Sequence, residues 1–152
     1  MKYFLLLFFL FPTILLAQFG KPTVKLIYQD KEVRSGDSVE RKDSIKLEIK
    51  MNDLLEGYKL SVPKIEWSWG WGVLAGIDVP DSCPPSETGI ISFWFNLNNR
   101  HPTRTPGVFR KLSPGVTIGI VIKYIAIISP DGIETKLKLP VSDLVRSFIV
   151  KE

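Results

Sequence analysis

A period-two alternation of apolar and polar residues, repeated along the chain, constrains this fold more than any other feature. In residues 44–51 every second side chain is apolar and most of those between are charged, and residues 65–71, 91–97 and 133–139 follow a similar rhythm. Successive side chains of a β-strand point to opposite faces of the sheet. Each segment is therefore predicted to be a strand with one face in a core and one face in water.

Three further segments complete the predicted strands. Residues 23–28 and 144–150 are shorter or less regular but β-rich, whereas residues 116–128 are apolar on parts of both faces. The last pattern fits a strand covered on both sides, and it also fits a strand with a bulge that switches its faces. The sequence Ser-Pro-Asp-Gly at 129–132 is a strong turn signal, because Pro presets one backbone angle and Gly accepts a positive one.

About seven strands without helical units between them predict an all-β fold, an immunoglobulin-like two-sheet sandwich in a single domain. No amphipathic helix longer than two turns is expected. Three long connections, residues 52–64, 74–88 and 98–114, are predicted to interrupt the strands. Loops of this length in a compact domain are either functional or mobile.

The N-terminal residues follow the pattern of a secretory signal. Lys2 precedes an apolar run over residues 3–16, and the small residue Ala17 comes before the polar Gln18. This predicts a signal peptide over residues 1–17 and a mature domain over 18–152. An uncleaved membrane anchor is the alternative, but a spanning helix needs about 20 apolar residues and this run is shorter. We therefore expect a periplasmic or extracellular protein with no stable membrane insertion after cleavage.

The charge and the catalytic inventory are both modest. The net charge is +4, too small and too spread for nucleic-acid binding, which needs a clustered basic face. The chain has one histidine, His101, and one cysteine, Cys83, which is too few for a catalytic triad or a zinc site. We therefore predict no catalytic residue, no metal and no cofactor, and do not expect an enzyme.

Cys83 has no partner for an internal disulfide. It is interpreted as a partly buried thiol beside two prolines, or as the attachment point of an intermolecular disulfide in an oxidising compartment.

Tryptophan is the most informative residue type for binding. Trp67, Trp69 and Trp71 fall on one face of a predicted strand. Exposed, they would form a stacking platform for sugars or an anchor for a protein; buried, they would be sandwich core, which the facing apolar positions of 91–97 favour. Trp94 falls instead on the polar-facing register of its strand. The candidate binding residues are Trp94, Arg100, His101, Arg104, Trp67, Trp69 and Trp71.

The C-terminal third resembles the C-terminal immunoglobulin-like domain of GldM, the periplasmic subunit of the gliding-motility and type IX secretion machinery. The shared elements are Leu-Ser-Pro-Gly at 112–115, the Ile-rich strand after it, Pro-Asp-Gly at 130–132 and the Lys-Leu repeat at 135–140. Val116 stands where that family often has an acidic residue, and the helical parts of the full subunit are missing. The resemblance implies a stand-alone sandwich that docks onto other proteins.

These observations favour a non-catalytic interaction module of the bacterial envelope that binds an envelope or surface protein through a sheet edge or its long loops. β-Augmentation is the natural mode for a sandwich with an exposed edge. The alternative is a carbohydrate-binding or adhesin-type domain that uses exposed tryptophans.

Overall fold

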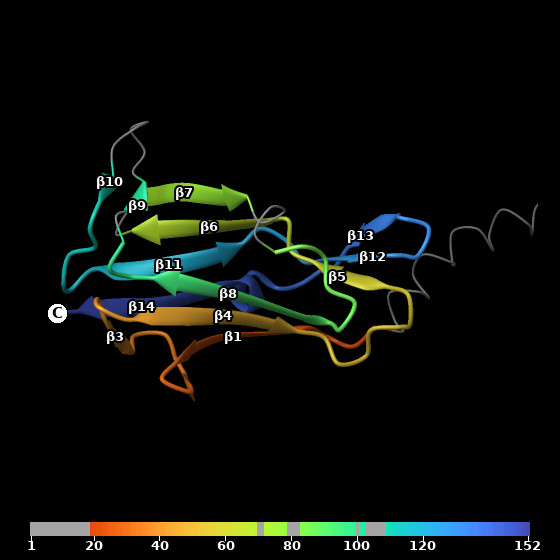
Figure 1. Cartoon of the computed structure of the whole chain (residues 1–152), viewed down its shortest axis with the longest axis horizontal. Coiled ribbons are helices and arrows are strands. Elements are labelled where there is room, and N and C mark those ends of the chain that lie inside the picture. Colours follow the sequence, from red (N-terminus) through yellow and green to blue (C-terminus); the bar gives the residue numbers. More distant parts are fainter. Residues whose placement is uncertain (1–18, 70–71, 79–82, 100, 103–108) are drawn as a thin grey trace, which may run out of the picture.

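The computed structural model describes residues 19–69, 72–78, 83–99, 101–102 and 109–152 (Figure 1). The predicted signal peptide lies outside the described residues. Within the described part of the chain, no helix has the length and apolar character needed to cross a bilayer.

Two main sheets build the molecule, with their strands along its long axis (Figure 1). The first sheet has the order β2-β1-β4-β8 and the second the order β3-β14-β11-β6-β7. The strands of the first sheet are β1 (Thr23–Tyr28), β2 (Lys31–Glu32), β4 (Ser44–Lys50) and β8 (Ile90–Asn96). Those of the second are β3 (Ser38–Glu40), β6 (Lys64–Trp69), β7 (Gly72–Asp78), β11 (Thr117–Ile122) and β14 (Val145–Lys151).

The strand order is that of an immunoglobulin sandwich. With β1, β4 and β8 as strands A, B and E, and β6, β11 and β14 as strands C, F and G, the two sheets reproduce its arrangement. The predicted all-β sandwich is therefore confirmed. In an immunoglobulin sandwich strand D lies beside strand E; among the described residues no strand takes that place beside β8.

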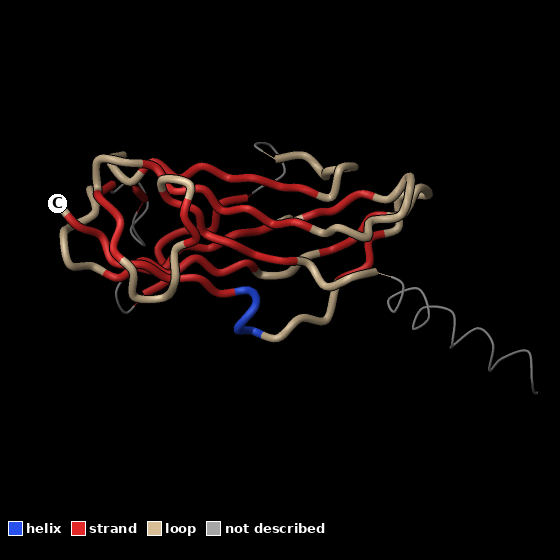
Figure 2. Tube along the Cα trace, turned by 90° about the horizontal axis from the view of Figure 1, so that it is seen from below, coloured by secondary structure: helices blue, strands red, loops and turns tan. Residues whose placement is uncertain are grey.

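Six shorter elements, five strands and one helical turn, complete the described fold. A small sheet has the order β13-β12-β5 (Glu134–Lys136, Ala126–Ile128, Lys59–Ser61), and β9 (His101–Pro102) pairs with β10 (Phe109–Arg110). The single-turn helix α2 (Val141–Leu144) lies outside the strands (Figure 2).

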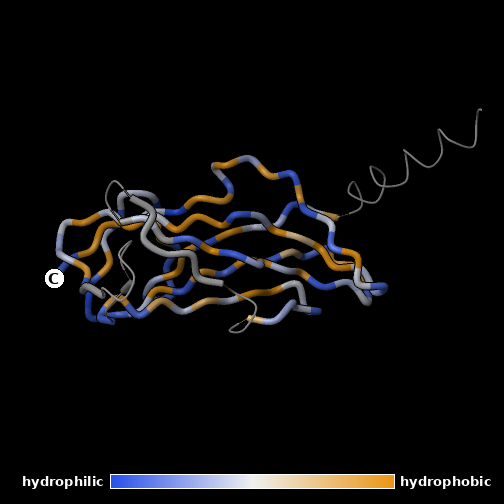
Figure 3. Tube along the Cα trace, turned by 90° about the horizontal axis from the view of Figure 1, so that it is seen from above, coloured by the Kyte–Doolittle hydropathy of each residue, from blue (hydrophilic) through white to orange (hydrophobic). Residues whose placement is uncertain are grey.

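The alternation of apolar side chains correctly located the core. Ile45, Leu47 and Ile49 of β4 are buried between half-exposed polar residues, and β8 and β11 repeat the pattern. Hydrophobic positions accordingly recur along the strands in Figure 3. Each fully buried Leu, Ile or Phe contributes about 1.5–3 kcal/mol.

Three predictions about segments need correction. The predicted connections 52–64, 74–88 and 98–114 contain β5, most of β7, and β9 with β10. Residues 116–128 form not one strand but two, because β11 ends at Ile122 and β12 joins the small sheet.

The predicted strand 133–139 is the third case. Only Glu134–Lys136 is a strand, and all three of its residues are exposed. On the predicted apolar face Ile133 is 62% exposed, whereas Leu137 and Leu139 beyond the strand are partly buried against the core. β13 is an edge of the small sheet and pairs with β12.

Candidate functional site

Trp94 is the large apolar side chain that stands out on the first sheet. It is 69% exposed, and Ile90, Ser92 and Asn96 face the same side of β8 and are also exposed. The prediction that Trp94 lies on the solvent-facing register is confirmed. Between these residues Ile91, Phe93 and Phe95 are buried. The strand is thus anchored in the core by one face and presents an uncharged face with an indole to solvent.

The exposed face of β8 differs in charge from the exposed faces of β4 and β1 in the same sheet. Lys46 and Glu48 of β4 form an ion pair at 2.7 Å, and Lys25 of β1 pairs with Glu32 at 3.0 Å. The four solvent-facing residues of β8 carry no charge. Proteins normally protect sheet edges with charges, prolines or bulges. None of these is present within β8, whose pairing with β4 continues without a register shift from Ile90 to Asn96.

Alternate residues of β8 direct their backbone N–H and C=O groups toward β4 and away from it. Just beyond the strand's two ends, Met51 N donates to Gly89 O at 2.8 Å and Leu97 N donates to Asp43 O at 3.0 Å. In an antiparallel pair the residues that bond to the neighbouring strand alternate with residues whose N–H and C=O point away from it. The odd-numbered residues of β8 therefore bond to β4. The even-numbered ones, including Ser92 and Trp94, direct their backbone groups to the outer edge.

The thiol of Cys83 accepts a hydrogen bond from one of these outward groups, the Ser92 N–H. Its pKa is raised by burial, and a backbone hydrogen bond from Ser92 partly opposes the increase. The thiol therefore lies against the Ser92 N–H at the β8 edge. The Cys83 side chain is partly buried, as one of the two sequence interpretations expected. Sulfur is a weak acceptor, so this N–H is only weakly satisfied.

The other end of the β8 edge closes in a turn. Asn99 N donates to Asn96 O at 3.4 Å, and Asn98 N donates to Asn96 Oδ1 at 3.0 Å. Four outward backbone groups remain between the two ends: Ser92 C=O, Trp94 N–H and C=O, and Asn96 N–H. No partner for them occurs among the described residues.

On the side of the outer β8 edge, the second sheet extends beyond the first. In Figure 1, which looks down the shortest axis, β6 and β7 lie beyond β8, on the side of its outer edge. The position next to β8 is therefore overhung by two strands of the opposite sheet. It corresponds to strand D of the immunoglobulin sandwich.

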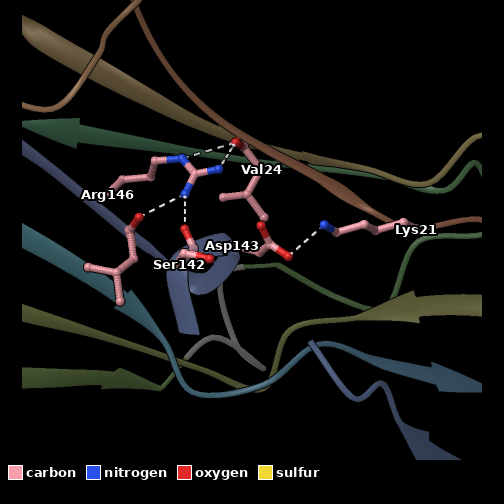
Figure 4. Close-up of polar contacts among 6 residues, drawn as sticks. Lys21, Val24, Ser142, Asp143 and Arg146 are labelled. Carbon is pink, nitrogen blue, oxygen red and sulfur yellow. Dashed lines mark hydrogen bonds and ion pairs between the residues drawn. The ribbon is translucent and has the colours of Figure 1, made fainter. Parts of the chain in front are cut away.

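The opposite side of the first sheet is closed by Arg146 (Figure 4). This residue of β14 is opposite the buried Ile120, and its side chain crosses to the first sheet. Nε and Nη2 donate to Val24 O at 3.1 and 2.7 Å, and Nη1 donates to Ser142 O at 2.9 Å and Val145 O at 2.7 Å. Arg146 therefore caps the β1 edge and holds α2 against it.

Two hollows near the start of the described chain offer weaker sites. One of about 310 Å³ is lined by Arg146, Lys21, Lys25, Glu32 and Asp143, among others. Lys25 pairs with Glu32, and Lys21 Nζ lies 2.8 Å from Asp143 Oδ2. Asp143 Oδ2 accepts no hydrogen bond of standard geometry in the described part of the chain, so the Lys21 contact is an ion pair only. The charges in this hollow thus already have partners.

The second hollow, of about 430 Å³, is mostly apolar and lies between Phe19 and the segment 137–140.

The remaining predicted binding residues are only partly described. Trp67 and Trp69 lie in β6, where their backbones pair with Ile120 and Ile118, but their side chains lie outside the description. His101 forms the backbone pair with Arg110, and its side chain is likewise not described. Trp71, Arg100 and Arg104 lie outside the described residues.

Sequence reasoning missed the backbone half of the site. Ile90, Ser92 and Asn96 are in the same phase as Trp94, so the alternation contained the signal that they share its face. That their backbone groups stand at an open edge depends on the sheet order, which the alternation does not reveal.

Within the described residues no group of three or more His, Cys, Asp or Glu side chains could hold a metal ion. No protein-family model and no curated protein sequence matches this chain.

Proposed function

We propose that this chain is a non-catalytic binding module that accepts an extended segment of another protein at the β8 edge. The proposal rests on one observation: a row of backbone groups without a partner among the described residues borders an uncharged strand whose face carries the exposed Trp94. In β-augmentation such groups provide hydrogen bonds to an added strand, and neighbouring side chains provide specificity.

Further considerations favour a partner in the bacterial envelope. The signal-like N-terminal segment favours export, and the resemblance to a periplasmic docking domain favours a protein partner. An overhung edge offers an added strand contacts with two layers at once. We therefore propose an exported module, periplasmic or extracellular, whose partner is an envelope or surface protein.

A proline substitution tests the proposal at the backbone. Trp94→Pro removes the outward N–H and the indole, yet leaves the bonds from β8 to β4, since proline is tolerated where an edge N–H faces outward. Glu134→Pro on β13 is the matched control, because Glu134 also lies on an edge strand and is exposed.

The measurement is selection of linear twelve-residue random peptides on the immobilised mature domain. Synthetic copies of the selected peptides are then titrated against the variants, whose folding is checked by circular dichroism. We expect Trp94→Pro to weaken binding at least tenfold and Glu134→Pro to leave it unchanged. Failure to select any peptide, or equal binding to both variants, would overturn the proposal.

Carbohydrate binding is a second candidate function, and the exposure of Trp94 specifically favours it. The indole has polar neighbours on the same face, Ser92 and Asn96 on β8 and Lys46 on β4, and a flat apolar ring with polar neighbours suits a sugar. Quenching and a blue shift of tryptophan fluorescence on addition of oligosaccharide, absent in Trp94→Ala, would support it. Silence across a broad glycan array would exclude it.

A further inference from the structure

The part of the β8 edge that has no partner within the described ranges of the chain is short and has two defined ends. We infer that its occupant is a single extended segment of about five residues, uncharged, with an aromatic or β-branched residue beside Trp94. This inference rests on the proposed function and specifies the partner of the same edge.

The length of the segment follows from the backbone groups for which the described part of the chain supplies no partner. They run from Ser92 C=O to Asn96 N–H, with the Cys83 thiol on one side and the Asn99 N–H on the other. At ~3.4 Å per residue, this stretch matches about five residues of an antiparallel partner. A longer strand would have to displace Cys83 or open the turn at Asn96–Asn99.

The chemistry follows from the side chains around Trp94. Cross-strand pairs of an aromatic residue with an aromatic or β-branched residue are favourable. On the same face of β8, the neighbours of Trp94 are the uncharged Ser92 and Asn96. Lys46 lies opposite Trp94 on β4 and already forms an ion pair with Glu48 at 2.7 Å. A charge on the central residue of the segment would therefore find no partner there.

The extension of β6 and β7 beyond β8 indicates whether the occupant of the edge is a single segment or a second folded domain. Neighbouring strands are ~4.8 Å apart, so two strands beyond β8 project by roughly 10 Å. A second copy of this sandwich that paired its own β8 there would bring an identical overhang into the same space (Figure 1). A single extended segment has no overhang of its own and therefore avoids this clash.

The experiment compares two peptide libraries on the mature domain. In the first, five random residues are flanked by Gly-Ser linkers; the second has twelve random residues. We expect the first library to yield binders that are uncharged and carry an aromatic or β-branched central residue, with binding lost in Trp94→Pro. Methylation of backbone amides in a synthetic binder should weaken binding at least tenfold at alternate positions only.

The outcomes separate the inference from the proposed function. If only the twelve-residue library yields binders, or if the five-residue binders are charged, and Trp94→Pro still abolishes binding, the occupant inference is wrong and the proposed function stands. If neither library yields a binder, both are wrong.

A variant of Cys83 tests whether its thiol limits the length of the bound segment. Cys83→Ala frees the Ser92 N–H, so a binder extended by two residues on that side should gain about three- to tenfold in affinity over the five-residue form. Wild type should show no such gain. Equal gains in both proteins would mean that Cys83 does not limit the segment.

Discussion

On the β1 side of the first sheet, the carbonyls of Val24 and Leu26 are occupied by Arg146 and by the backbone of Val33. On the β8 side, the outward groups of Trp94 have no partner among the described residues. Both strands belong to one sheet and pair with the same central strand, β4. At the β1 edge a side chain supplies the hydrogen bonds that a neighbouring strand would otherwise make. The β8 edge has no such side chain among the described residues, so it is the edge to investigate for binding.

Proline at adjacent β8 positions is expected to produce the largest contrast in stability. Phe93→Pro removes a backbone bond to β4 and a buried ring, which should cost more than about 4 kcal/mol of unfolding free energy. Trp94→Pro should cost about 1 kcal/mol or less, because its N–H faces outward. Urea unfolding of both variants measures the difference. Equal losses would contradict the assignment of inward and outward groups.

Removal of Arg146 should convert the closed edge into an open one. Arg146→Met leaves Val24 O without its donors, and an unsatisfied part-buried carbonyl costs about 1–3 kcal/mol. We expect this loss in urea unfolding, together with concentration-dependent association in sedimentation velocity. Arg34→Met provides the control, since Arg34 is exposed. A variant as stable and monomeric as the control would show that the guanidinium does not protect β1.

The Lys46–Glu48 pair should make a smaller contribution. Both side chains are about one quarter exposed, so solvent screening limits the pair to about 0.5 kcal/mol. Lys46→Met should lower stability by this amount at low salt and by less at 1 M NaCl, as measured by urea unfolding. A salt-independent loss would point to packing against Trp94 instead of charge.

The smallest expected effect concerns the Cys83 thiol at the β8 edge, and it is measured as a rate of alkylation instead of a free energy of unfolding. Burial raises the pKa of Cys83 above its usual value of 9.0. A raised pKa favours the neutral thiol in the fold, so any stabilisation is complete below pH 9 and is lost as the pH rises through the folded pKa. Iodoacetamide should therefore react more slowly with the folded domain at pH 8 than with the urea-unfolded chain. Faster reaction in the folded state would refute the burial of Cys83.

The sequence predicted those elements whose signal is local. Alternation located β4, β8 and the buried side of β11, and it placed Trp94 in solvent because that residue has the opposite phase to Phe93 and Phe95. It missed β7 because Gly72–Asp78 does not alternate cleanly and is a strand through its pairing with β6, which includes a bulge at Trp67–Ser68.

The two edges could not be predicted in the same way. Arg146 stands in the buried phase of β14, two residues before Phe148, so a charged residue in an inward position was a readable signal that it must find a partner. Its partner, Val24, is 122 residues away. The contact of Cys83 with the Ser92 backbone likewise depends on how the chain returns to the sheet.

The pairing of β3 with β14 has a mechanical consequence. The two strands run in the same direction over three residue pairs, Ser38–Ile149, Val39–Val150 and Glu40–Lys151. A tensile force applied to the chain after Lys151, with the rest of the domain held, acts along these strands and shears their hydrogen bonds together instead of peeling them apart one by one. Under such a load, force spectroscopy should find the β3–β14 ladder among the last contacts to yield.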